Sequence, residues 1–200
     1  MQDFNKNLQD IDNKLVNQRN RDPLLGRDGE PEPIPVSSVS LAAVAGFAAV
    51  TLAFHAFGAQ GWVPILDSAN LAIHEAGHPL TGILSERLSV YGGTLFQLAF
   101  PVAVAVHFRR EGHAAGAAAG LVWLGENLLN VARYMADARA QLLPLVGGGE
   151  HDWTEIFSRW RILHLDTRVA GLTRFAALAL MAWALWRLYR QWKADRLAGG

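Results

Sequence analysis

The sequence predicts an all-α fold, a polytopic bundle of membrane helices that follows a polar arm. Two observations predict this class. Residues 1–35 hold 12 of the chain's 18 basic and 18 acidic side chains, whereas residues 37–65 hold none. About 20 apolar helical residues are enough to cross the hydrocarbon layer of a membrane, so the second stretch is long enough to span one. Further apolar runs follow it, separated by short polar breaks.

The composition narrows the range of partners and cofactors. A formal charge of +0 provides no basic excess for nucleic acid. The chain has 0 cysteines, so any bound metal must be held by His, Asp or Glu. The first apolar run begins only near Leu41, after the polar arm, which favours a retained membrane anchor over a cleaved signal peptide.

Three regions follow one another along the chain. Residues 1–36 form the polar arm, with a short amphipathic helix predicted at 3–19 and a proline-rich linker at 22–36. Residues 37–190 form the membrane domain, and residues 191–200 form a basic tail. The membrane domain contains five apolar segments, at about 38–58, 63–84, 93–108, 114–137 and 169–187.

The five segments differ in polarity. The first and the last are apolar throughout and are predicted to be full spans. The middle three carry polar residues, which should face each other or a wet cavity because polar groups in lipid are costly. The segment at 93–108 is short, follows Gly92 and Gly93, and contains Pro101, so it is either a short span or a re-entrant, partly extended piece. The prediction is therefore four or five transmembrane segments.

Basic residues gather in the arm and in the tail, which predicts that both ends of the membrane domain face the cytoplasm of a bacterial inner membrane. Five simple spans would place these ends on opposite sides. Either one segment does not cross, or the charge rule misleads in this chain.

The stretch HEAGH at residues 74–78 is the strongest chemical signal in the sequence. His74 and His78 are four residues apart, so on a helix both imidazoles can reach one metal ion. Glu75 lies beside them, where the glutamate of H-E-x-x-H metallohydrolases takes a proton from the metal-bound water. Zinc suits three N/O ligands and an open fourth position. The competing interpretation is a pair of packed, hydrogen-bonded histidines, and Pro79 predicts a kink beside them.

A third ligand must come from another segment. Asp137 and His151 are the leading candidates, followed by Glu126 and Asp152. Glu126, Asn130, Tyr134 and Asp137 form a polar stripe along one predicted helix. Asp67 is seven residues before His74, where it either orients a ligand histidine or caps the helix.

HEAGH in a membrane segment, followed downstream by NLL and then by an aspartate before a small residue, resembles the site-2 protease family of intramembrane zinc metalloproteases. The resemblance covers about residues 63–140. It implies that His74, His78 and Asp137 bind zinc and that Glu75 is the catalytic base. By the same analogy, GGTLFQ at 92–97 corresponds to an extended edge that holds substrate.

These observations lead to the hypothesis of an intramembrane zinc metallopeptidase that acts on a membrane protein or peptide in or near the bilayer. Asn127 and Asn130 are predicted either to bind the substrate or to join helices. A membrane zinc amidase that acts on a lipid is the first alternative, and a non-catalytic metal-binding or scaffold protein is the second. A di-iron oxygenase is excluded because it needs adjacent histidines, and none of the 7 histidines adjoin.

Overall fold

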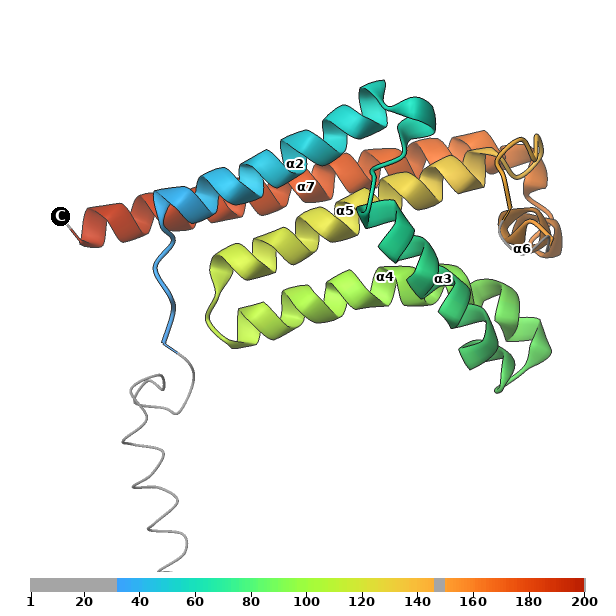
Figure 1. Ribbon diagram of the computed structural model, residues 1–200, viewed down its shortest axis with the longest axis horizontal. Coiled ribbons are helices and arrows are strands. Elements are labelled where there is room, and N and C mark those ends of the chain that lie inside the picture. Colours follow the sequence, from blue (N-terminus) through green and yellow to red (C-terminus); the bar gives the residue numbers. More distant parts are fainter. Residues whose placement is uncertain (1–31, 146–149, 200) are drawn as a thin grey trace, which may run out of the picture.

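The computed structural model describes residues 32–145 and 150–199, which form a bundle of helices (Figure 1). No strand occurs in these two ranges, so the predicted all-α class is confirmed. The amphipathic helix predicted at 3–19 lies outside the described residues. The α-helices are α2 (Ser38–Phe57), α3 (Leu66–Gly82), α4 (Glu86–Arg110), α5 (Ala114–Ala136), α6 (Asp152–Arg159) and α7 (Asp166–Ala198).

Three helical stretches are long and apolar enough to cross a membrane, as expected of a membrane protein. They are α2, α4 and the stretch Leu163–Ala198 that contains α7. The helix α5 packs against all three of these helices and therefore lies at the centre of the bundle. Its central position accounts for its polar stripe, because polar side chains in the bundle interior can find partners there.

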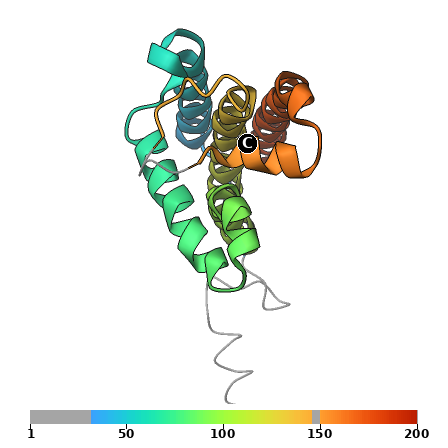
Figure 2. The same ribbon diagram turned by 90° about the vertical axis from the view of Figure 1, so that its right-hand side faces the viewer.

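The four long helices run side by side and alternate in direction (Figure 1). The start of α2 meets the end of α7, where Val36 N donates to Asp195 Oδ2 at 2.8 Å and Trp192 Nε1 donates to Ser38 Oγ at 3.1 Å. By contrast, α3 crosses the bundle obliquely and stays in the half that contains α6 (Figures 1 and 2). The two ends of the membrane domain thus lie at one end of the bundle because α3 does not traverse it.

The residues at the ends of the helices are of types that stabilise helix termini. Ser37 precedes α2, and its side chain accepts a hydrogen bond from Ser40 N at 3.0 Å. The helix α4 begins with Glu86 and ends with Arg109 and Arg110, charges that suit its dipole. The last turns of α7 include residues 191–198, so the predicted basic tail continues that helix.

The helix α4 decides between the two alternatives for 93–108, a short span or a re-entrant, partly extended piece, in favour of a helix. It is one continuous helix of 25 residues that includes a buried Pro101. Gly92 and Gly93 do not break it, because they serve close packing with α3: a Cβ on Gly92 would lie 2.3 Å from Gly77 O. The segment 92–97 is helical as well, so the proposed extended edge for substrate is wrong.

Glycine also permits close approach at the other main crossings. A Cβ on Gly120 of α5 would lie 2.8 Å from Ala105 N of α4. A Cβ on Gly125 would lie 2.3 Å from Met181 Cγ of α7. Small residues at such crossings let helix backbones pack closely in a membrane-type bundle.

Candidate metal centre

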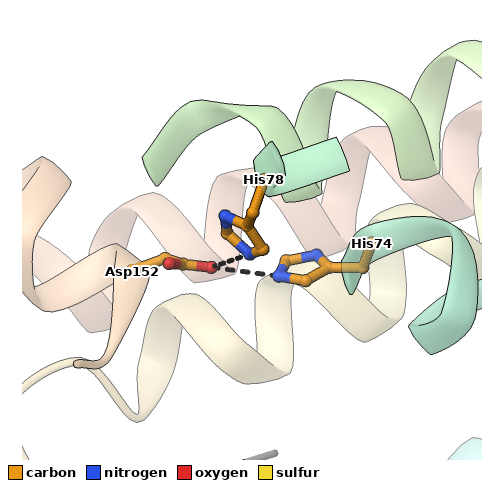
Figure 3. A group of neighbouring side chains, drawn as sticks. All are labelled: His74, His78 and Asp152. Atoms are coloured by element: carbon orange, nitrogen blue, oxygen red, sulfur yellow. Dashed lines mark hydrogen bonds and ion pairs between the residues drawn. The ribbon is translucent and has the colours of Figure 1, made fainter. Parts of the chain in front are cut away.

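His74 and His78 lie on one face of α3, with ring centroids 4.9 Å apart. Both rings direct Nε2 at the same oxygen, Asp152 Oδ2, at 3.0 Å from His74 and 3.4 Å from His78 (Figure 3). The three side chains form a group whose possible ligand atoms lie within 4.8 Å of one another. Tetrahedral ligands that are each about 2.1 Å from a zinc ion lie about 3.4 Å apart. The observed separations therefore leave room for one ion with modest adjustment.

The hydrogen bonds of the two Nδ1 atoms determine which nitrogen of each histidine faces the centre. His78 Nδ1 lies 2.9 Å from the backbone oxygen of Ser89, and His74 Nδ1 lies 3.1 Å from Gln97 Oε1. Both partners are acceptors, so each Nδ1 carries the hydrogen and donates it. In a neutral imidazole the Nε2 atom is then a bare lone pair. A positive charge between these two nitrogens and the carboxylate oxygen, either a metal ion or a proton on an imidazole, would stabilise this arrangement.

Hydrogen bonds to the second nitrogen are the usual support of histidine ligands, because they fix the ring orientation and raise ligand basicity. Gln97 and Ser89 supply this support from α4, and Gln97 is buried. The sequence pattern gave no reason to select either residue. The only feature that marks them is their position on α4, which packs against α3: Gln97 offers a polar side chain there and Ser89 a backbone carbonyl.

Asp152 is the first residue of α6, directly after the loop that leads into this helix, and its side chain lies at the centre. Its backbone N–H donates to Tyr134 Oη at 3.2 Å. The next turn is held by Thr154, whose N–H donates to His151 Nδ1 at 3.3 Å and whose hydroxyl donates to Ala138 O. Burial raises the pKa of Asp152, but the hydrogen bonds from His74 and His78 outweigh it and leave that pKa below its usual value.

The two leading third-ligand candidates of the sequence lie outside this group. Asp137 accepts hydrogen bonds from Leu142 N at 2.9 Å and from Leu143 N at 3.0 Å, so it caps the turn after α5. His151 Nε2 lies 3.5 Å from Asp137 Oδ2. Burial lowers the pKa of His151 and outweighs the opposite effect of Asp137. The geometry thus favours Asp152 as the third ligand over Asp137, the position implied by the site-2 protease resemblance.

The remaining candidates join α3 to α5. Asp67 accepts from Val63 N and from Asn130 Nδ2, each at 2.8 Å, so it holds the turn before α3 and bonds α5 rather than His74. Glu126 accepts from Asn70 Nδ2 at 2.8 Å. Asn127 Nδ2 lies 3.3 Å from Asn70 Oδ1. Among the described contacts, these asparagines link helices.

A cavity of about 660 Å³ opens beside the three side chains. Glu75, which is exposed, lines it together with His74, His78 and Asp152. The outer wall carries both signs of charge, from Glu86, Arg87, Glu150, Glu155 and Arg159. Glu75 and the three possible ligands thus open onto the same cavity.

The fold and this centre define a helical membrane-type protein with a candidate His₂Asp metal site beside a glutamate. No protein-family model, curated protein or solved structure matches the chain.

Proposed function

We propose that the chain is a membrane-embedded zinc metallopeptidase that hydrolyses a peptide bond in or near a membrane segment of its substrate. The observation that carries this proposal is the convergence of His74 Nε2, His78 Nε2 and Asp152 Oδ2, with both Nδ1 atoms engaged by acceptors. In this proposal the group binds a cation through three protein ligands, and zinc is the ion that such N/O sets favour in hydrolases.

Each side chain has a separate task in this proposal. His74, His78 and Asp152 would hold the ion, and Gln97 and Ser89 orient the two imidazoles. When bound, zinc supplies Lewis-acid polarisation of the carbonyl and lowers the pKa of a water molecule. Glu75 accepts a proton from the attacking water and returns it to the leaving amine. The cavity gives an extended peptide access to these groups.

The arrangement of the helices suggests an orientation in a bacterial inner membrane. The start of α2 and the end of α7 lie together, and the last turns of α7 carry Arg190, Lys193 and Arg196. We place this end of the bundle in the cytoplasm. The metal centre then opens toward the other face of the membrane, because α6 lies at the opposite end (Figure 1).

The orientation can be tested cleanly because the chain has 0 cysteines. Ser158→Cys on α6 and Ala194→Cys on α7 are exposed sites at the two ends of the bundle. In intact spheroplasts, an impermeant maleimide should label the variant at position 158 and spare the variant at 194. Labelling of 194 but not of 158 would reverse the orientation, and equal labelling of both would contradict a bundle that spans the bilayer.

The activity is tested with Glu75→Gln, which removes the base and leaves the three ligands intact. Membranes that contain the wild type should show new protein N-termini, by mass spectrometry, that are missing from Glu75→Gln membranes. Both purified proteins should contain the same zinc. Identical N-termini at equal zinc content would contradict proteolysis, and a difference confined to lipid amides would favour a lipid amidase instead.

A further inference from the structure

A second cavity, of about 140 Å³, adjoins the metal centre. His74, Glu75, Tyr134 and Leu145 line both this cavity and the larger one. A molecule that reaches the three ligands through the large cavity therefore passes the boundary of the small one. The small cavity is placed to receive a group next to the atoms that react.

The wall of the small cavity is mostly apolar. Its apolar side chains come from three parts of the chain and are Trp62, Leu71, Val131, Leu143, Pro144 and Leu145. Three charged side chains also lie on this wall, Asp67, Glu75 and Arg133, and Glu75 is on the boundary shared with the large cavity. Asp67 accepts from Val63 N and from Asn130, and the guanidinium of Arg133 lies 5.7 Å from the centre of the Trp62 ring.

The size of the cavity suits one side chain. An engineered apolar cavity of about 150 Å³ in another protein binds benzene, so about 140 Å³ accommodates an isobutyl or phenyl group. The large cavity, by contrast, has charged walls that include Glu86, Arg87 and Glu155. The wall of the small cavity is thus mostly apolar, and the wall of the large one carries more charged side chains.

We infer that the small cavity is a specificity pocket for an aliphatic or aromatic side chain next to the bond that is cleaved. This inference rests on the proposed function, because it takes the metal centre as the reacting site. It identifies the substrate as a chain with a large apolar residue on one side of the scissile bond and a polar segment on the other. Such a sequence occurs where an apolar membrane segment meets the water.

The pocket can be tested by binding alone, without a known substrate. The probes are three hydroxamic acids, with a methyl, an isobutyl or a benzyl group, added to the full-length protein in detergent after it is loaded with Co²⁺. The hydroxamate binds the metal, and the visible absorption of cobalt reports the binding. Burial of an isobutyl or benzyl group should tighten binding about tenfold or more over methyl.

Leu71→Trp should fill the pocket and remove this preference, with the affinity for the methyl compound unchanged. Leu71→Ala enlarges the pocket and should favour benzyl over isobutyl more than the wild type does, which keeps the test valid if the Trp variant does not fold. Leu80→Trp is the matched control, since Leu80 is on the same helix and is exposed outside both cavities. Comparison with this control also corrects for the uptake of apolar probes by detergent micelles.

The outcomes separate the two proposals. Hydroxamates that bind without preference, a preference that survives in Leu71→Trp, or a benzyl-to-isobutyl ratio that Leu71→Ala leaves unchanged would overturn the pocket and leave the metal centre standing. A protein that binds no cobalt, or binds it without any response to the three probes, would overturn the metal centre and the pocket together.

Discussion

The contact between Gly93 and His74 provides a sensitive test of the metal centre. A Cβ at position 93 would lie 2.5 Å from His74 Nε2, 2.6 Å from Cε1 and 2.7 Å from Cδ2. Carbon atoms in contact are normally about 3.5–4.0 Å apart, so Gly93→Ala must displace the imidazole by about 1 Å. Metal–ligand distances vary by only about 0.2 Å. The helix can stay in place because the ring can swing, but the ring can no longer reach the ion.

We expect Gly93→Ala to keep its helical circular dichroism and to lose zinc affinity by about 100-fold or more, since losing a ligand should cost at least as much as the 10–100-fold loss of a supporting contact. Competition with a chromophoric chelator measures this affinity. Gly82→Ala is the matched control: it adds the same methyl group to a helix, but its Cβ would lie 3.7 Å from Ser89 Oγ, which is ordinary contact. Zinc binding by Gly93→Ala within threefold of the Gly82→Ala value would refute the proposed position of His74 in the centre.

Three further predictions concern the acidic residues around α6. Asp152→Asn should lower zinc affinity by about 100-fold or more, measured by the same competition, because it removes a charged ligand. The pKa of Asp152 is below its usual value, so its ionised form stabilises the metal-free fold above about pH 4, and this stabilisation is lost as the pH falls further. The wild type should therefore melt at a higher temperature than Asp152→Asn in EDTA at pH 7, and this difference should shrink as the pH falls below about 4; a constant difference would contradict the lowered pKa of Asp152. Arg139 donates to both oxygens of the buried Asp166 at 2.8 Å, so Arg139→Gln should lower the melting temperature by a few degrees, and an unchanged value would show that water replaces the guanidinium.

The sequence predicted the helices well where apolar runs end at charged or turn residues. The run at 114–137 matches α5, Ala114–Ala136, because the preceding His113 and the following Asp137 mark its ends. It left 93–108 open between a span and a re-entrant piece, because Gly92 and Gly93 resembled a break. Their function is tertiary: they let α3 approach α4, and only the packed structure shows which partner needs the space.

The candidate site was also predictable from the sequence only where the pattern is local. The spacing of His74 and His78 is local, so the sequence alone placed both imidazoles on one helical face. The third member, Asp152, reaches the centre from a loop with no periodicity to extrapolate. The polar stripe of α5 indicated Asp137 instead. Asp137 lies at the correct end of the bundle, but its two oxygens accept hydrogen bonds from Leu142 N and Leu143 N.

His151 provides the last test. Its place in the sequence is suitable for a metal ligand, whereas its contacts are those of a residue that supports the ligand Asp152. Its Nδ1 accepts from Thr154 N at 3.3 Å, so it caps α6 directly before Asp152. An asparagine side chain can make the same cap, whereas alanine cannot. His151→Asn should therefore keep one zinc per chain with affinity close to that of the wild type, and His151→Ala should bind zinc about tenfold more weakly, as when a supporting contact is lost. If His151→Asn loses zinc as completely as His74→Ala does, then His151 is a ligand and the arrangement around Asp152 changes when the metal binds. Retention of zinc by His151→Asn, together with its loss in Asp152→Asn, would assign coordination to Asp152 and leave His151 the role of holding that carboxylate toward the two imidazoles.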